Sequence, residues 1–130
     1  MRREVVITGM GAVSPIGNTV KEMWDTVLHA GCGIAPITRY DTEGRKVTLA
    51  GEVKDLNPEQ YIEKRELRKM DRYTQYAMSA AVQACRDAQI REAGEEDEDT
   101  WMTRSRWGII LASGIGGIRT IEEEQMRGME

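Results

Sequence analysis

Cysteine and histidine are scarce in this chain, and their scarcity limits the chemistry that it can perform. The 130 residues include two cysteines, Cys32 and Cys85, and a single histidine, His29. Two cysteines cannot build a disulfide framework or a cysteine-rich metal cluster, so we expect no metal and a reducing compartment. Prolines are few as well, and the composition, 40% hydrophobic and 31% charged, is that of a globular protein.

Long apolar runs and a positive net charge are also missing. No stretch approaches the length of a transmembrane span, and the apolar run that follows Glu4 is too short for a signal-peptide core. The net charge of −4 argues against a general nucleic-acid binder. We therefore expect a cytoplasmic protein with no membrane and no nucleic acid among its partners. A chain of this length ordinarily forms one domain.

The glycines of Gly9-Met10-Gly11 follow the apolar run Val5-Val6-Ile7, as in the start of a dinucleotide-binding loop. Such a loop needs a third glycine and a helix that opens at once. Here Ser14 stands at the third position, and the proline after it disfavours a helical backbone there. The next plausible helix start is Asn18 or Thr19, both good N-cap residues, and Glu22 is placed for a capping box with Thr19. The motif therefore predicts no nucleotide cofactor.

Apolar periodicity predicts two main helices. The first is expected over 20–30, where glycines at 31 and 33 end it. The second and longest is expected over 65–90. Small residues let a helix approach its neighbours closely, so we expect this helix to be central and buried. Its stripe recurs at steps of three and four residues and is mostly alanine: Met70, Tyr73, Ala77, Ala81, Ala84 and Ala88.

Shorter segments lie between these helices. Residues 34–46 are expected to form a loop and residues 47–53 a short strand. Pro58 favours the first position of a short helical turn. Residues 93–100, AGEEDEDT, are expected to form a solvated acidic loop.

Two apolar runs, over 5–8 and 107–113, predict buried strands. A glycine loop, 114–117, follows the second run, and a helix is expected to begin near Ile118. Strands that alternate with helices indicate an α/β fold with largely parallel pairing. Three strands and an uncapped last helix make a poor complete sheet of that class. We therefore expect the chain to be part of a larger fold.

Cys32 lies three residues after His29, which raises the possibility of a nucleophilic dyad. Both residues fall at the C-terminal end of a predicted helix, where the helix dipole raises a thiol pKa rather than lowering it. A surface turn explains them better. Cys85 falls within the alanine-rich helix and is expected to be a small core residue.

The segment 64–72 carries five cations and two acids. Helical spacing places Arg65, Arg68, Lys69 and Arg72 along one side of the predicted helix. A solvated face explains the pattern by itself. The alternative is a docking patch for an acidic partner.

Three stretches, taken in order, resemble one family. RREVVITGMGAVSPIGN, KRELRKMDRYTQYAMSAAVQA and GIILASGIGG are similar to the N-terminal region of the β-ketoacyl-acyl carrier protein synthases, and most of all to the type II enzymes of fatty-acid synthesis. The resemblance covers residues 3 to about 124. It implies a thiolase fold, an α-β-α-β-α layered sandwich of two similar halves, of which 1–130 would be the N-terminal part of the first. It also implies a homodimer that condenses an acyl group with a malonyl unit carried on acyl carrier protein.

The resemblance transfers few functional residues to this chain. Arg65, Arg68 and Lys69 match the patch that docks the carrier protein, and Ile115 matches a residue that lines the acyl pocket. The family's cysteine nucleophile and two histidines fall in segments beyond residue 130, so we expect no catalytic residue here, no cofactor, and no condensation by this chain alone. The segment 100–106 fits the family poorly.

Two other functions remain open at the level of sequence. One is a non-catalytic subunit, like the chain-length partner of polyketide ketosynthases, in which the nucleophile is replaced. The other is a stand-alone module that binds a carrier protein through the basic segment.

Overall fold

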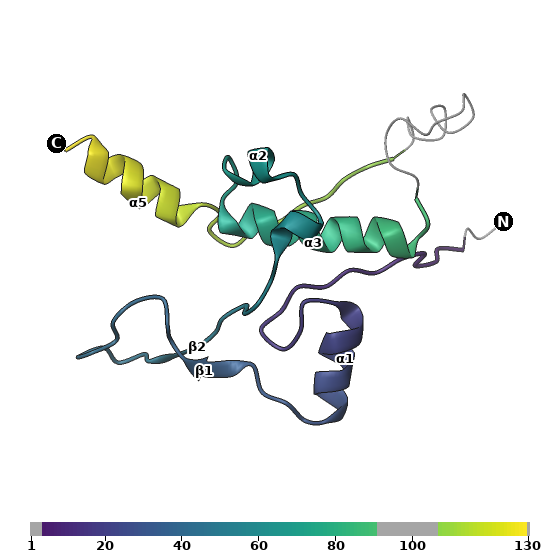
Figure 1. The fold of residues 1–130 in the computed structure, drawn as a ribbon, viewed down its shortest axis with the longest axis horizontal. Coiled ribbons are helices and arrows are strands. Elements are labelled where there is room, and N and C mark those ends of the chain that lie inside the picture. The colour runs from purple at the N-terminus through teal and green to yellow at the C-terminus, as the bar shows by residue number, and fades with distance from the viewer. Residues whose placement is uncertain (1–3, 91–106, 130) are drawn as a thin grey trace.

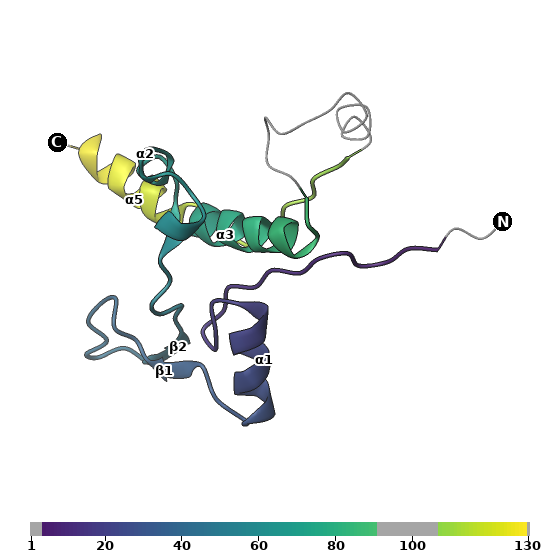
Figure 2. The same cartoon turned by 45° about the vertical axis from the view of Figure 1, so that its right-hand side comes forward.

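The computed structural model describes residues 4–90 and 107–129. The acidic segment 93–100 and the segment 100–106 lie outside the described residues. The elements follow the order α1 (Val20–Leu28), β1 (Ile34–Pro36), β2 (Leu49–Gly51), the 3-10 turn η1 (Pro58–Gln60), α2 (Lys64–Leu67), α3 (Arg72–Asp87) and α5 (Ile118–Arg127). Helix α3 lies at the middle of the molecule (Figures 1 and 2).

The N-terminal segment runs beside α3, and its glycines allow a very close approach (Figure 1). A methyl group added at Gly9 would lie 2.6 Å from the Ala88 amide nitrogen, and one at Gly11 would lie 2.8 Å from the Ala84 amide nitrogen. Any side chain at these positions would therefore collide with the helix backbone. Helix α3 occupies the space next to these two glycines, and no room is left there for a pyrophosphate.

Helix α1 begins as its sequence predicts. The Thr19 hydroxyl accepts a hydrogen bond from the Glu22 amide at 3.2 Å, and the Glu22 carboxylate accepts one from the Asn18 amide at 2.8 Å. The capping box is therefore present, although its return bond reaches one residue earlier than the usual pattern. At the other end the helix closes at His29, and Ala30 takes the left-handed conformation, φ 52°. The expected end at residue 30 is correct to two residues.

The sheet differs from the predicted one. Strands β1 and β2 pair antiparallel, with Ala35 opposite Ala50, and form the only sheet among the described residues. The prediction of a loop over 34–46 is thus wrong at Ile34–Pro36, while β2 falls within the predicted strand 47–53. This pairing joins neighbours in the chain through a turn, and an antiparallel pair needs no crossover helix.

The two predicted buried strands are not paired. Residues 5–8 and 107–113 carry no strand assignment, and their apolar side chains are exposed: Ile7 at 82% and Ile110 at 99%. A strand exists only with a neighbour that accepts its backbone hydrogen bonds. Among the described residues only β1 and β2 pair as a sheet, and they pair antiparallel, so the expectation of parallel pairing is wrong for this part of the chain.

The predicted long helix 65–90 is divided in two. Helix α2 ends at Leu67, and α3 begins at Arg72, after Asp71 has taken an extended backbone with ψ 157°. The Gln75 side-chain amide donates to the carbonyl oxygens of Leu67, at 3.3 Å, and Met70, at 3.0 Å. These bonds satisfy carbonyl groups that the break leaves without a helical partner.

The buried face of α3 also differs from the predicted one. Ser79 is completely buried, whereas Ala81 and Cys85 are exposed, so Cys85 is not a core residue in this chain. The alanines at 84 and 88 do lie under the N-terminal glycines. The alanine stripe therefore predicts the close approach to the N-terminal segment correctly. The most deeply buried residue of α3, Ser79, does not belong to that stripe.

The isolated chain should not show a cooperative thermal transition. Ile62 is the only buried apolar side chain among the described residues, and large apolar side chains are exposed along most of the elements. So little apolar burial cannot offset the conformational entropy of ordering the chain. We expect a purified sample to bind a hydrophobic dye and to lose helical circular dichroism gradually on heating. A sharp transition in a monomeric sample would contradict this.

Candidate functional site

The three predicted docking residues share one exposed surface at α2. Arg65 lies in the helix, Arg68 ends it, and Lys69 follows at once; all three side chains are exposed. We call these three residues the basic turn. The predicted alignment with Arg72 along one helix is wrong, because Arg72 begins the separate helix α3.

The cations of this region differ in how freely they can bind a partner. The Lys69 ammonium pairs with the Glu66 carboxylate at 2.8 Å, and the neighbouring Lys64 pairs with Glu59 at 3.5 Å. Within the described residues, Arg65 and Arg68 form no ion pair. Their guanidinium groups are therefore the charges of the basic turn that are free to meet an acidic surface.

The chain before α2 is fixed to the C-terminal half of α3. Ile62 is buried there, and the Arg86 guanidinium lies 5.6 Å from the centre of the Tyr61 ring. Arg86 also donates to the Gln60 carbonyl oxygen at 3.4 Å. The basic turn thus projects from a segment that is held at both ends: by Tyr61 and Ile62 before α2 and by Gln75 after it.

The glycine loop 114–117 carries the predicted pocket residue, Ile115. The loop is tightened by the Ser113 hydroxyl, which accepts a hydrogen bond from the Gly116 amide at 3.0 Å, and Gly116 takes φ 74°. Glycine adopts that conformation without steric cost. Ile115 is 72% exposed, and it is not among the residues that line the groove described next.

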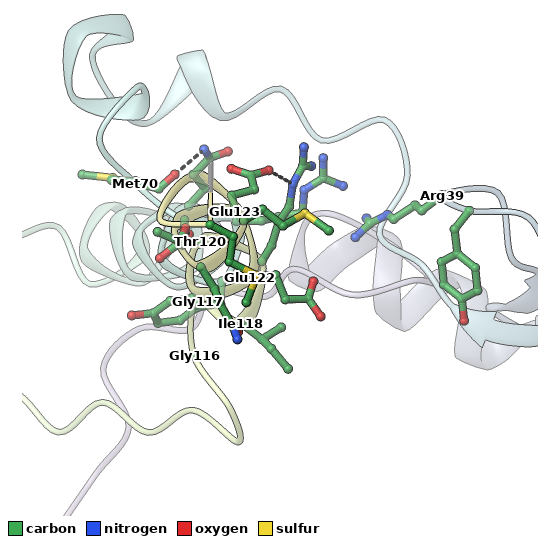
Figure 3. Close-up of a pocket in the computed structure, with 17 residues that line it drawn as sticks. Arg39, Met70, Gly116, Gly117, Ile118, Thr120, Glu122 and Glu123 are labelled. Carbon is green, nitrogen blue, oxygen red and sulfur yellow. Dashed lines mark hydrogen bonds and ion pairs between the residues drawn. The ribbon is translucent and has the colours of Figure 1, made fainter.

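A broad groove of about 1340 Å³ lies between α3 and α5 (Figure 3). Gly116 and Gly117 bring the glycine loop to its wall, α5 contributes Thr120, Glu122 and Glu123 among others, and Arg39 stands at the opposite side. The wall combines methionine side chains with charges of both signs. Ile115 directly precedes Gly116 in the sequence, but its side chain does not line the groove.

Arg39 is held at that rim by a polar cluster that no sequence motif reveals. The Glu52 carboxylate accepts from the Thr38 hydroxyl at 2.7 Å and from the Thr38 amide at 3.2 Å, and the Arg39 Nε lies 3.8 Å from it. Arg39 also donates to the Tyr76 hydroxyl of α3 at 3.0 Å. The cluster joins the β1–β2 hairpin to α3. No spacing rule predicts it, because its members lie in three separate segments.

The same hydrogen bonds set the pKa of Glu52. Donation from the Thr38 hydroxyl favours the charged form most, so the pKa of the carboxyl lies below its usual value of 4.5 although burial opposes this. The amide of Thr38 and the charge of Arg39 act in the same direction. Glu52 is therefore a carboxylate at neutral pH, and the cluster is charged.

The residues of the proposed dyad are not joined. The His29 ring nitrogen Nδ1 lies 2.7 Å from the Asp25 carbonyl oxygen, at the end of α1, while the Cys32 sulfur accepts from the Ile34 amide at 3.4 Å. Both side chains are engaged by nearby backbone, as expected for a surface turn. The described residues also hold no group of histidine, cysteine and acidic side chains able to bind a metal, and no helix long and apolar enough to cross a membrane.

Comparison with known proteins gives a consistent result. Residues 2–129 match the family model described as beta-ketoacyl synthase, N-terminal domain. The chain is 51% identical over 120 residues to 3-oxoacyl-[acyl-carrier-protein] synthase 2 of Staphylococcus aureus (strain COL), which covers 92% of this chain and 27% of that protein. It is 35% identical over 126 residues to the protein of the same name from Synechocystis sp., with 95% and 28% covered.

A solved structure agrees with these matches. The ishigamide ketosynthase/chain length factor superposes on 100% of this chain and 31% of its own with a TM-score of 0.73, at 31% identity. The chain spans about a quarter of the length of the curated relatives it matches. The relatives therefore contain much more protein than these 130 residues.

The stability conferred by Glu52 should decrease on acidification. Because the pKa of folded Glu52 is below 4.5, its contribution is complete above pH 4.5 and is lost as the pH falls through the folded pKa. A suitable protein is a chimaera in which this chain replaces the matching segment of the S. aureus relative. Glu52→Gln should lower its free energy of unfolding in urea at pH 6, and the difference from the parent should shrink below pH 4.5.

Glu43→Gln is the matched control, because Glu43 is an exposed glutamate in the same hairpin. It should leave the pH dependence unchanged. If Glu52→Gln and Glu43→Gln behave alike at every pH, the cluster around Glu52 contributes nothing.

Proposed function

Because this chain belongs to the β-ketoacyl synthase family, we propose that it is the N-terminal part of an enzyme that condenses an acyl group with a malonyl unit on acyl carrier protein, with loss of carbon dioxide. The observation that carries the proposal is the 51% identity to a synthase of this kind over 92% of the chain. The expected fold class is confirmed, since the chain is a ketosynthase N-terminal domain with a thiolase-like fold.

We propose that the residues that carry out bond formation lie in other parts of the enzyme. Condensation needs a nucleophile to hold the acyl group and donors to stabilise charge on the thioester oxygen. Cys32 and His29 are bound to local backbone, and Cys85 lies on an exposed face of α3. None of them is paired as a nucleophile with a base. The proposed contribution of the chain itself is to bind and orient the substrates.

The basic turn is the proposed docking surface for the carrier protein. Arg65 and Arg68 are exposed, are not neutralised by an internal acid in the described structure, and stand on a short helix held by Ile62 and Gln75. A fixed pair of guanidinium groups can bind carboxylates of an acidic partner with defined geometry. Lys69 contributes to docking once its ammonium group leaves the Glu66 carboxylate and pairs with an acidic group of the partner.

Ile115 is the proposed acyl-contacting residue. It is an exposed apolar side chain on a tight loop, shortly after the exposed apolar run 109–111. Exposed apolar side chains in such number favour a partner surface. We propose that the rest of the enzyme, including a second subunit of a cytoplasmic homodimer, covers this region and completes the pocket.

A non-catalytic chain-length subunit is the second candidate. The structural match to a ketosynthase/chain length factor favours it, since that protein has the same fold over this whole chain. The identity of 31% is lower than the 51% to the S. aureus synthase, so the condensing enzyme is the better supported function.

The purified 130-residue chain should have no condensing activity. It should transfer no radiolabelled malonyl carbon to an acyl group when both substrates are supplied on acyl carrier protein. The chimaera with the S. aureus synthase should be active, because the replacement preserves the fold and the substrate contacts. Product formed by the isolated chain would show that catalysis does not depend on residues outside it. An inactive but folded chimaera would mean that this segment does not support condensation, and it would contradict the proposed function.

Reversal of charge at the basic turn should slow association with the carrier protein. In the chimaera, Arg68→Glu with Lys69→Glu should reduce the association rate constant about tenfold at low salt, because these charges steer the encounter. The loss should decrease as ionic strength rises. Reaction with a small thioester that is not attached to a carrier should be nearly unchanged. Stopped-flow fluorescence with a labelled carrier measures the rate.

Lys21→Glu with Lys46→Glu gives a matched control. These exposed lysines lie on α1 and in the hairpin, away from α2, and the net charge changes equally. An equal effect of the two double substitutions would mean that only net charge matters. Loss of activity toward both kinds of thioester would mean damage to the fold, and the docking role would be abandoned.

A further inference from the structure

Asp71 occupies the position from which a side chain normally caps its own helix, but it does not cap α3. Aspartate is among the preferred N-cap residues, because its carboxylate accepts from amides of the first turn. Here the Asp71 side chain forms no such bond to α3. Its carboxylate instead accepts a hydrogen bond from the Thr120 hydroxyl, in the first turn of α5. The side chain therefore joins two helices that are far apart in the sequence.

The start of α5 is built to receive a carboxylate from outside. Its N-cap is Gly117, which has no capping side chain, and its first turn contains no acid. A methyl group at Gly117 would lie 2.7 Å from the Asp71 carboxyl carbon, so the absence of a side chain there makes room for Asp71. The negative charge of Asp71 thus lies at the positive end of the α5 dipole, where it stabilises the helix.

Asp71 is itself fixed on the side of the basic turn. The backbone that leads to it carries Arg68 and Lys69, and the Gln75 amide holds this segment through the Leu67 and Met70 carbonyl oxygens. On the other side, Thr120 lies three residues after Gly117. A short chain of bonds therefore runs from α2 through Gln75 and Asp71 to α5 and the glycine loop.

We propose that Asp71 is a positioning residue that sets the glycine loop, and with it Ile115, at a fixed place relative to the basic turn. The inference rests on the proposed function in one respect, namely that Ile115 contacts the acyl chain. Its consequence is that acyl-chain selection depends on Asp71 and Thr120, because their hydrogen bond holds the helix that follows the loop of Ile115. Docking of the carrier protein should not depend on them, because Arg65 and Arg68 project from the other side of the break.

Two variants of Thr120 separate this role from a general effect on folding. In the chimaera, Thr120→Val keeps the shape of the side chain but removes the hydroxyl, whereas Thr120→Ser keeps the hydroxyl. Hydrogen exchange should show about tenfold less protection of the first amides that α5 bonds, from Ile121 on, in Thr120→Val and in Asp71→Ala, as loss of a hydrogen bond to a charged group implies. Thr120→Ser should match the parent.

Kinetics give the second readout. Thr120→Val should broaden the preference among acyl chains of different length about two- to fivefold and leave the KM for malonyl-carrier protein unchanged. Thr120→Ser should restore the parent preference. Unchanged exchange in α5 of both Thr120→Val and Asp71→Ala would overturn the inference, as would altered exchange with an unaltered preference.

These failures differ from failure of the proposed function. If the chimaera condenses and the basic turn still steers the carrier, but Thr120→Val behaves as the parent does, only the role of Asp71 is wrong. If the chimaera does not condense, the exchange experiment still tests the bond between Asp71 and α5. Equal loss in Thr120→Val and Thr120→Ser would also refute the inference, since the hydroxyl would then have no part.

Discussion

The close contact between the N-terminal segment and α3 determines where the other segments of the chain can lie. Gly9 and Gly11 let two backbones meet without side chains between them. Gln83 of α3 then donates to the Asn18 carbonyl oxygen at 2.8 Å, and the Asn18 side-chain amide donates to the Lys54 carbonyl oxygen at 2.7 Å. Helix α3 thereby fixes where α1 begins and where the chain leaves β2.

The functional surfaces are arranged around the same helix by polar contacts rather than by a large apolar core. Glu52 and Arg39 bind the hairpin to Tyr76, and Gln75 and Asp71 bind the basic turn and α5 to the first turn of α3. Hydrogen bonds to charged groups are directional, so these few contacts specify which segments meet and in what arrangement. They do not replace the apolar burial that the isolated chain lacks.

Local features are predicted well because their causes are local. Thr19 caps α1, Asn57 caps the turn begun by Pro58, and Gly117 precedes the helix expected near Ile118. The two caps depend on a side chain that bonds backbone a few residues away. The break at 68–71 is not predicted, because it is stabilised by the side-chain amide of Gln75, which bonds the carbonyl oxygen of Met70. A glutamine in a helical pattern gives no sign that its side chain will bond backbone that precedes the helix.

Residue types and their order are enough to establish the family, the cationic residues Arg65, Arg68 and Lys69, and the glycine loop 114–117. Four features are known only from the three-dimensional arrangement: the antiparallel pairing of β1 with β2, the exposure of Ile7 and Ile110, the cluster at Glu52, and the reach of Asp71 to Thr120. The reason is that pairing and polar contacts between distant segments depend on which partner lies within bonding distance, and spacing along one chain does not specify that.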